Sequence, residues 1–212
     1  MKSMKWIAAG LMAGTSFAAM PAQAAGDLNL ICSADVVICE QMKNSFEKDH
    51  DIRVNMVRLS SGETYAKVRA EARNPKTDIW WAGTGDPHLQ AASENLTQEY
   101  KSPMLGELND WAVKQAESAD YKTVGVYAGA LGWGFNTDIF KQKNLKEPKC
   151  WADLLDPGLK GEIQVANPNS SGTAYTALAT LVQIMGEDQA FDYLKKLNAN
   201  ISQYTKSGSA PV

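Results

Sequence analysis

The chain has 212 residues, of which 44% are apolar and 21% charged, and its 21 basic and 24 acidic side chains give a formal net charge of −3 at pH 7. This acidic balance argues against a nucleic-acid partner, which requires a basic face. The apolar fraction is ordinary for a globular protein, and the length allows one large domain or two small ones.

The first 24 residues match a secretory signal peptide. Lys2 and Lys5 precede an apolar run from Trp6 to Met20, and Ala22-Gln23-Ala24 provides an A-x-A cleavage site. The run of about 15 residues is shorter than the roughly 20 that span a bilayer. Its removal takes away two lysines and no acidic residue, which leaves 19 basic and 24 acidic side chains, a net charge of −5. The sequence therefore predicts a soluble, exported protein.

Three cysteines follow this segment: Cys32, Cys39 and Cys150. Export permits disulfides, and an odd count leaves one thiol unpaired. Cys32 ends a predicted strand, and Cys39 lies seven residues further on, in the first turn of the next predicted helix. We expect a Cys32–Cys39 disulfide that pins this strand–helix loop, with two independent buried thiols as the alternative. The spacing contains no C-x-x-C pair, so it indicates neither a redox motif nor a zinc site.

Three strand–helix units come next along the chain. Short apolar strands are predicted over 28–32, 52–56 and 78–81, and each precedes a segment with apolar residues at helical spacing. Such units indicate an α/β fold with a largely parallel sheet, connected by right-handed crossovers.

Small polar residues occupy the loop after each of these strands: Ser33, then Ser60-Ser61-Gly62, then Gly83-Thr84-Gly85. Ligands of open α/β sheets bind at the carboxyl edge of the strands. Three such loops in one sheet therefore predict a polar rim with many free amides.

The next segment, 94–121, has a mixed pattern that we interpret as surface helices and loops. Four glycines then alternate with apolar residues up to Phe135: Gly125, Gly129, Gly132 and Gly134. Small residues in extended chain suit a bend or a close backbone approach, and hinges often lie in such segments. We interpret this stretch as a crossover between two lobes, with a Gly-rich strand pair as the alternative.

A fourth polar loop lies further along the chain. A strand predicted over 162–166 leads into Asn167-Pro168-Asn169-Ser170-Ser171-Gly172-Thr173, after which apolar residues recur on one helical face up to Met185. Asn167-Pro168 favours a turn, and Asn169 or Ser170 is the expected N-cap. The free amides and positive dipole end of this helix favour an anion, although capping alone would also explain the serines.

The remaining elements are short. Asn136 is expected to cap a short helix, 187–198 is predicted as a helix and 201–204 as a strand, and 207–211 is expected to open another helix. Because the chain stops at Val212, directly after this last loop, we expect the sequence to be a fragment.

Signatures of catalysis are missing from the sequence. It contains no G-x-S-x-G elbow, no G-x-x-x-x-G-K-[ST] loop and no H-E-x-x-H pair. Of the two histidines, His50 lies in a polar turn, while His88 lies at a helix start, where a structural role and a place in a site are both open. We predict no catalytic residue, no metal ligand and no cofactor; an exported hydrolase that uses a loop serine is a weaker alternative.

Several motifs occur in a fixed order: Asp78-Ile79-Trp80-Trp81-Ala82-Gly83-Thr84-Gly85-Asp86-Pro87, Gly132-Trp133-Gly134-Phe135-Asn136, Trp151-Ala152-Asp153-Leu154-Leu155-Asp156-Pro157, Gly161-Glu162-Ile163 and the loop 167–173. This ordered set resembles the periplasmic solute-binding proteins of ABC importers, in the type II branch usually labelled ferric-iron-binding. The resemblance implies a periplasmic, monomeric, two-lobed α/β protein that closes on a solute and docks on an inner-membrane permease. The expected division is a signal peptide over 1–24, lobe one over 25–125, a crossover over 126–135 and an incomplete, truncated lobe two over 136–212.

The resemblance also bears on the ligand. Ferric binders of this branch use a histidine in the first strand–helix loop and a late pair of adjacent tyrosines, whereas here the first loop is Cys32-Ser33-Ala34-Asp35 and no Tyr-Tyr occurs before Val212. The loop residues suit phosphate or carboxylate oxygens instead, and some relatives bind phosphorylated sugars. We therefore expect a small anionic solute such as a sugar phosphate, with ferric ion as the alternative. The expected ligand-binding residues are Ser33, Ser60, Ser61, Thr84, Gly85, Ser170, Ser171, Gly172 and Thr173.

Overall fold

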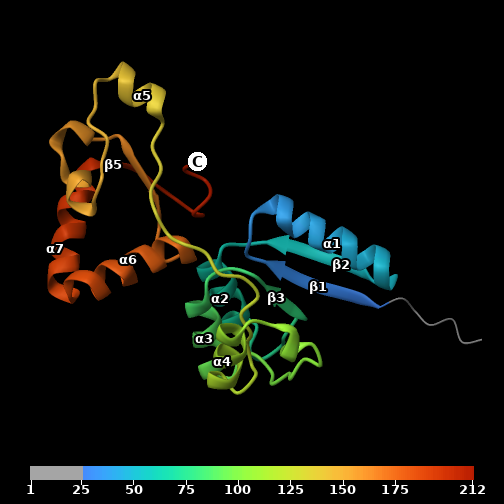
Figure 1. Ribbon diagram of the computed structural model, residues 1–212. Coiled ribbons are helices and arrows are strands. Elements are labelled where there is room, and N and C mark those ends of the chain that lie inside the picture. Colours follow the sequence, from blue (N-terminus) through green and yellow to red (C-terminus); the bar gives the residue numbers. More distant parts are fainter. Residues whose placement is uncertain (1–25) are drawn as a thin grey trace, which may run out of the picture.

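The computed structural model describes residues 26–212, and the predicted signal peptide over residues 1–24 lies outside this range. The helices and strands form two groups (Figure 1), which we call lobe one (residues 27–118) and lobe two (residues 137–205). Each lobe is built on a parallel sheet, as the repeated strand–helix units predict. No helix in the described range has both the length and the apolar character needed to cross a membrane.

Lobe one contains a three-stranded parallel sheet in the order β2-β1-β3. The strands are β1 (Asp27–Cys32), β2 (Arg53–Arg58) and β3 (Ile79–Trp81), and the helices that follow them are α1 (Val36–His50), α2 (Ser61–Ala70) and α3 (Gly85–Ser93). The three predicted strand–helix units are therefore confirmed. Because parallel strands end at the same edge of a sheet, the three polar loops of this lobe lie together at its carboxyl edge.

A disulfide joins Cys32 at the end of β1 to Cys39 in α1, as the sequence predicts. The two Cα atoms are 6.0 Å apart, and both side chains are fully buried. Between the two cysteines, Asp35 is the N-cap of α1, and its side chain accepts a hydrogen bond from the amide of Val37. The third cysteine, Cys150, is a free, exposed thiol. The disulfide thus ties the first polar loop to the helix behind it.

Replacing both Cys32 and Cys39 by alanine is expected to lower the free energy of unfolding by about 2.5 kcal/mol, because the cross-link restricts a loop of about eight residues in the unfolded chain. Urea unfolding under non-reducing conditions measures this difference. Cys150→Ser is the matched control, since that thiol is exposed and forms no disulfide. Equal unfolding midpoints for the double variant and the wild type would contradict the prediction.

The segment between the two lobes contains neither helix nor strand from residue 123 to residue 136, so the alternative of a Gly-rich strand pair is wrong. It follows η1 (Leu105–Glu107) and α4 (Asp110–Ser118), which confirm the surface helices expected there, and runs on to α5 (Thr137–Gln142) in lobe two (Figure 1). Asn136 caps α5 as predicted, through bonds from two backbone amides. Close packing accounts for one of the four glycines of this segment, because a Cβ on Gly125 would collide with the ring of Trp111.

Lobe two is built on the parallel pair β4 (Ile163–Ala166) and β5 (Ile201–Thr205). Its helices are η2 (Trp151–Leu155), η3 (Pro157–Leu159), α6 (Gly172–Met185), α7 (Glu187–Leu197) and η4 (Asn198–Asn200). Residues 207–211 form bends and turns, so the helix expected to open there is wrong. Gly208 is a weak helix former, and Pro211 has no amide hydrogen to donate within a helix.

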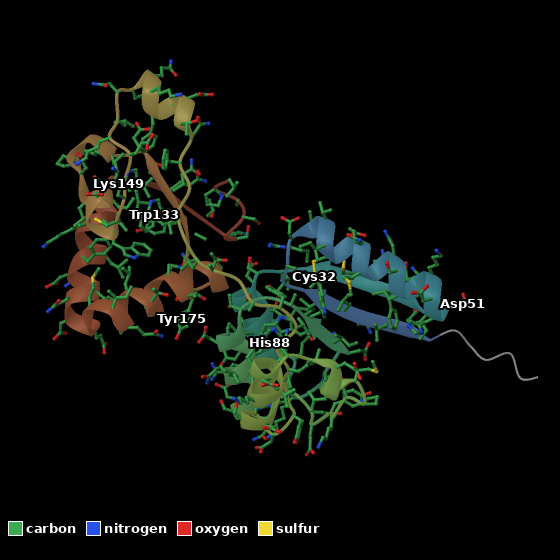
Figure 2. All side chains as sticks on the ribbon, in the orientation of Figure 1. Cys32, Asp51, His88, Trp133, Lys149 and Tyr175 are labelled. Atoms are coloured by element: carbon green, nitrogen blue, oxygen red, sulfur yellow. A yellow bond between two sulfur atoms is a disulfide. The ribbon has the colours of Figure 1, made fainter. Side chains whose placement is uncertain are left out.

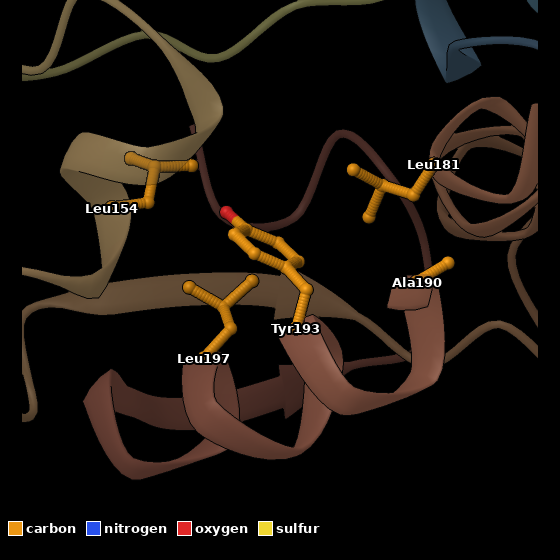
Figure 3. Close-up of a cluster of buried hydrophobic side chains, with 5 residues drawn as sticks. All are labelled: Leu154, Leu181, Ala190, Tyr193 and Leu197. Carbon is orange, nitrogen blue, oxygen red and sulfur yellow. The ribbon is translucent and has the colours of Figure 1, made fainter. Parts of the chain in front are cut away.

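The core of lobe two is a cluster of five buried side chains (Figure 3): Leu154, Leu181, Ala190, Tyr193 and Leu197. Tyr193 inserts its ring among the aliphatic groups and donates its hydroxyl proton to the carbonyl of Trp151 at 2.5 Å. Burial raises the pKa of Tyr193 to about 12, so the phenol stays neutral in this core. The cluster packs α6 and α7 against η2, and so holds the start of α6 in place.

Candidate functional site

The polar loops of the two lobes are in direct contact. The amide of Gly62 donates to the carbonyl of Ser170 at 2.9 Å, and the hydroxyls of Ser60 and Ser170 both reach the carbonyl of Lys206, at 3.2 and 2.9 Å. We call the nine predicted ligand-binding residues the interlobe rim. They are Ser33, Ser60, Ser61 and Thr84 with Gly85 in lobe one, and Ser170, Ser171, Gly172 and Thr173 in lobe two. Figure 2 shows Cys32, which precedes Ser33, at the end of β1 that faces lobe two.

Ser33 is held in a chain of hydrogen bonds inside lobe one. The indole Nε1 of Trp80 donates to Ser33 Oγ at 2.9 Å, Ser33 Oγ lies 3.0 Å from Thr64 Oγ1, and Thr64 Oγ1 donates to the carbonyl of Ser60 at 3.1 Å. An indole N–H only donates and a carbonyl only accepts, so the Thr64 proton goes to Ser60 and the Ser33 proton goes to Thr64. Ser33 therefore has no proton left for a ligand in this arrangement.

Ser60 and Ser61 open α2 and are both buried, each 4% exposed. The proton of Ser60 is engaged by the carbonyl of Lys206. Ser61 differs, because its Oγ accepts a hydrogen bond from the amide of Thr84 at 3.2 Å and no described residue accepts its own proton. Ser61 can therefore donate to a ligand while keeping its structural bond.

The third loop of lobe one has a left-handed backbone at two successive residues, Ala82 with φ 64° and Gly83 with φ 102°. This conformation costs roughly 1–2 kcal/mol at a residue with a Cβ, so other contacts must hold it. His88 Nε2 lies 2.9 Å from the carbonyl of Ala82, and the hydroxyl of Tyr127 bonds to both the amide and the carbonyl of Gly83, at 3.1 Å each. The ring of His88 stacks on Trp80 at 3.8 Å, and burial lowers the pKa of His88. His88 thus supports the loop as a neutral ring.

This loop presents Thr84, whose Oγ1 is buried and has no hydrogen-bond partner among the described residues. A buried hydroxyl without a partner costs roughly 1–3 kcal/mol. A Cβ on Gly172 of lobe two would fall well inside contact distance of Thr84 Oγ1 and 2.8 Å from Ser61 Oγ. Two hydroxyls with free protons therefore face the first residue of α6.

The N-cap of α6 is Ser171, and not Asn169 or Ser170 as expected. Ser171 is 2% exposed, and its Oγ accepts from the amide of Ala174 at 3.3 Å. Asn169 is instead held in the turn by the Asn167 side chain, and the Ser170 hydroxyl is directed to Lys206. No described residue accepts the proton of Ser171, so this hydroxyl is also free to donate.

Tertiary structure thus divides the interlobe rim into four sets. Ser61, Thr84 and Ser171 carry free hydroxyl protons beside the start of α6, whereas the protons of Ser33, Ser60 and Ser170 are engaged within the protein. Gly172 is buried between the lobes. Gly85 and Thr173 are exposed at the margin.

The sequence did not identify three residues that shape this region, Arg58, Thr64 and Lys206. Trp80 and Tyr127 were candidates as aromatic residues near a ligand, but their hydrogen bonds to the rim loops were not expected. The contacts of these five residues to rim loops join residues as far as 146 positions apart, and short-range patterns do not report such pairs. A cationic side chain at the end of β2, directly before the polar loop, is a signal that could have identified Arg58. Within residues 26–212, no group of three His, Cys, Asp or Glu side chains is placed to hold a metal ion.

Comparison with known proteins identifies the family to which this chain is similar. The family described as bacterial extracellular solute-binding protein matches residues 74–211. A protein of Haemophilus influenzae, described as uncharacterized, is 46% identical over 206 residues, which cover 97% of this chain and 58% of that protein.

Solved structures agree with this match. The periplasmic binding protein P5PA is 41% identical with a TM-score of 0.82, and AfuA from Actinobacillus pleuropneumoniae, with exogenous fructose-6-phosphate bound, is 46% identical with a TM-score of 0.79. Each similarity covers 86% of this chain and 58% of the other. Iron-bound HitA from Pseudomonas aeruginosa is 19% identical with a TM-score of 0.63, over 84% of this chain and 56% of that one, and shares the fold alone. The chain therefore spans about 58% of the length of the H. influenzae protein, of P5PA and of AfuA.

Proposed function

Because this chain belongs to the bacterial extracellular solute-binding proteins, we propose that the whole protein binds a sugar phosphate between its two lobes and delivers it to an ABC permease. The chain has the two-lobed fold of the periplasmic binding proteins, as its resemblance implied. The proposed activity is capture without chemical conversion, in the periplasm and as a monomer. We propose the boundaries 25–125 for lobe one, 126–135 for the crossover and 136–212 for the part of lobe two in this chain.

The observation that carries the proposal is the set of free hydroxyl protons on Ser61, Thr84 and Ser171. A phosphate group accepts hydrogen bonds at every oxygen and donates few, so it needs donors of this kind around it. The three hydroxyls lie at the starts of α2, α3 and α6, where the positive ends of the helix dipoles also favour an anion.

The relatives support the same class of ligand. AfuA is 46% identical to this chain and binds fructose-6-phosphate in its solved structure. HitA, with bound iron, is 19% identical, a level that supports a common fold and no common ligand. We therefore propose a sugar phosphate in preference to ferric ion, and find no observation that favours the hydrolase alternative.

The test is calorimetry of the full-length protein with fructose-6-phosphate, fructose, inorganic phosphate and ferric citrate. We expect heat of binding with the sugar phosphate and much weaker binding of fructose, because fructose lacks the anion. Binding of ferric citrate alone would overturn the proposal.

Thr84→Val is the most informative variant, since it deletes a buried hydroxyl without a protein partner and keeps the shape of the side chain. We expect the affinity for fructose-6-phosphate to fall roughly 10- to 100-fold, the value of a hydrogen bond to a charged group. The stability of the ligand-free protein should stay the same or increase, because an unsatisfied buried group is removed.

Thr97→Val is the matched control, because Thr97 Oγ1 is likewise buried without a partner but Thr97 lies outside the interlobe rim. It should change stability in the same direction and leave calorimetric affinity unaltered. If both variants bound the sugar phosphate like the wild type, Thr84 would have no part in the site.

A further inference from the structure

Arg58 is the last residue of β2, at the carboxyl edge where the rim loops of lobe one begin. Its side chain is half-buried and lies across two of these loops. Nε donates to the carbonyl of Ala34, next to Ser33, at 3.0 Å, and Nη1 donates to the hydroxyl of Ser60 at 3.5 Å. The plane of the guanidinium is therefore fixed by the first and second polar loops together.

These two bonds leave three of the five N–H donors of the guanidinium unused. None of the ion pairs within residues 26–212 includes Arg58. In the described part of the chain, Arg58 is also the one cationic side chain that hydrogen-bonds to a residue of the interlobe rim. An unpaired positive charge with free donors thus lies beside a site whose other side-chain donors are neutral hydroxyls.

We propose that Arg58 supplies the charge of the site and makes it selective for a dianionic phosphate monoester over monoanionic and neutral analogues. The inference rests on the proposed function and identifies what decides the ligand class. Hydroxyls and amides can donate to a phosphate ester and to a sulfate ester of the same shape. A fixed positive charge distinguishes the two, because its attraction grows with the charge of the ligand.

The side chain suits this role better than a lysine would. A guanidinium offers a planar fork that matches two oxygens of a phosphate, while an ammonium is a point charge on a flexible stem. The bonds to Ala34 and Ser60 hold that fork in position before the ligand arrives, so little side-chain freedom is lost on binding.

The test compares Arg58→Gln and Arg58→Lys with the wild type in the full-length protein, by calorimetry with fructose-6-phosphate and fructose-6-sulfate at pH 8. At this pH the phosphate ester is a dianion, since its second pKa is about 6. We expect Arg58→Gln to lose roughly 100-fold in affinity for the phosphate and about tenfold for the sulfate, which reduces the preference for phosphate about tenfold. Arg58→Lys should keep most of the preference and recover part of the affinity, because it restores the charge without the fork.

Arg53→Gln is the control, since Arg53 lies on the same strand at its other end, is exposed and makes no ion pair within residues 26–212. It should bind both esters like the wild type. Equal losses for the two esters in Arg58→Gln, or no loss at all, would overturn the inference and leave the proposed function standing. A wild-type protein that binds neither ester would instead overturn the proposed function. If Arg58→Gln fails to fold, the ester preference of Arg58→Lys decides, and loss of that preference would count against the inference.

Discussion

Replacing Gly62 by alanine is expected to weaken solute binding roughly 100-fold without unfolding either lobe. A Cβ at this position would overlap the carbonyl oxygen of Asn169 and lie 3.0 Å from that of Ser170. Both atoms belong to the backbone of the loop before α6, so neither can rotate away. The two lobes would have to separate there, which breaks the Gly62–Ser170 bond and moves Ser61 away from Ser171.

Helix α2 itself should tolerate the change at Gly62. Alanine is a better helix former than glycine by roughly 0.5–1 kcal/mol, so the thermal stability of the ligand-free protein should not fall. Calorimetry gives the affinity, and small-angle scattering reports whether the lobes have moved apart. Gly106→Ala serves as the control, because nothing lies within 4 Å of the Cβ that it adds. Wild-type affinity in the Gly62 variant would show that the lobes do not need this contact.

Leu181→Ala is expected to lower the free energy of unfolding of lobe two by about 3–4 kcal/mol. Leu181 is 1% exposed, lies on α6 and contacts the cluster that includes Leu154, Tyr193 and Leu197 (Figure 3). Truncation leaves a cavity between α6 and α7, because backbone elements on both sides of the cluster limit its collapse. Since α6 begins at the interlobe rim, affinity should fall as well when this helix loosens.

Urea unfolding followed by tryptophan fluorescence measures the effect, because Trp151 packs against this cluster. Ile184→Ala, on the same helix, is the matched control, since Ile184 is 62% exposed and its truncation should change stability by less than about 0.5 kcal/mol. Similar losses in the two variants would mean that the cluster is not the core of lobe two.

The local features of the fold could be predicted because they depend on neighbouring residues. Alternation and helical spacing located the three strand–helix units of lobe one, and the seven-residue separation of Cys32 and Cys39 anticipated their disulfide. The cap of α5 by Asn136 was equally local. The prediction failed where candidates competed within one loop: Asn169, Ser170 and Ser171 can all cap a helix, and the tertiary contacts of Ser170 with Lys206 leave Ser171 to do so.

In the candidate site, too, local features could be predicted and long-range contacts could not. Residue type and position were enough to predict a polar rim at strand ends, but not which hydroxyls keep a proton that no described residue accepts. That distinction depends on the direction of each hydrogen bond: Trp80 and Thr64 engage Ser33, while Thr84 is left without a partner. The position of Tyr127 against Gly83, 44 residues earlier in the chain, also arises only when the crossover folds back on lobe one.

By itself, the sequence determined the three strand–helix units of lobe one, the disulfide and the placement of four polar loops after strands, because periodicity and turn residues act over a few positions. Tertiary structure alone decided which rim residues keep free protons, that Gly62 and Gly172 are points of close approach between the lobes, and that the Arg58 side chain donates to the carbonyl of Ala34. These features depend on contacts between loops far apart in the chain. The contacts of Gly62 and Gly172 form only when both lobes have folded and met.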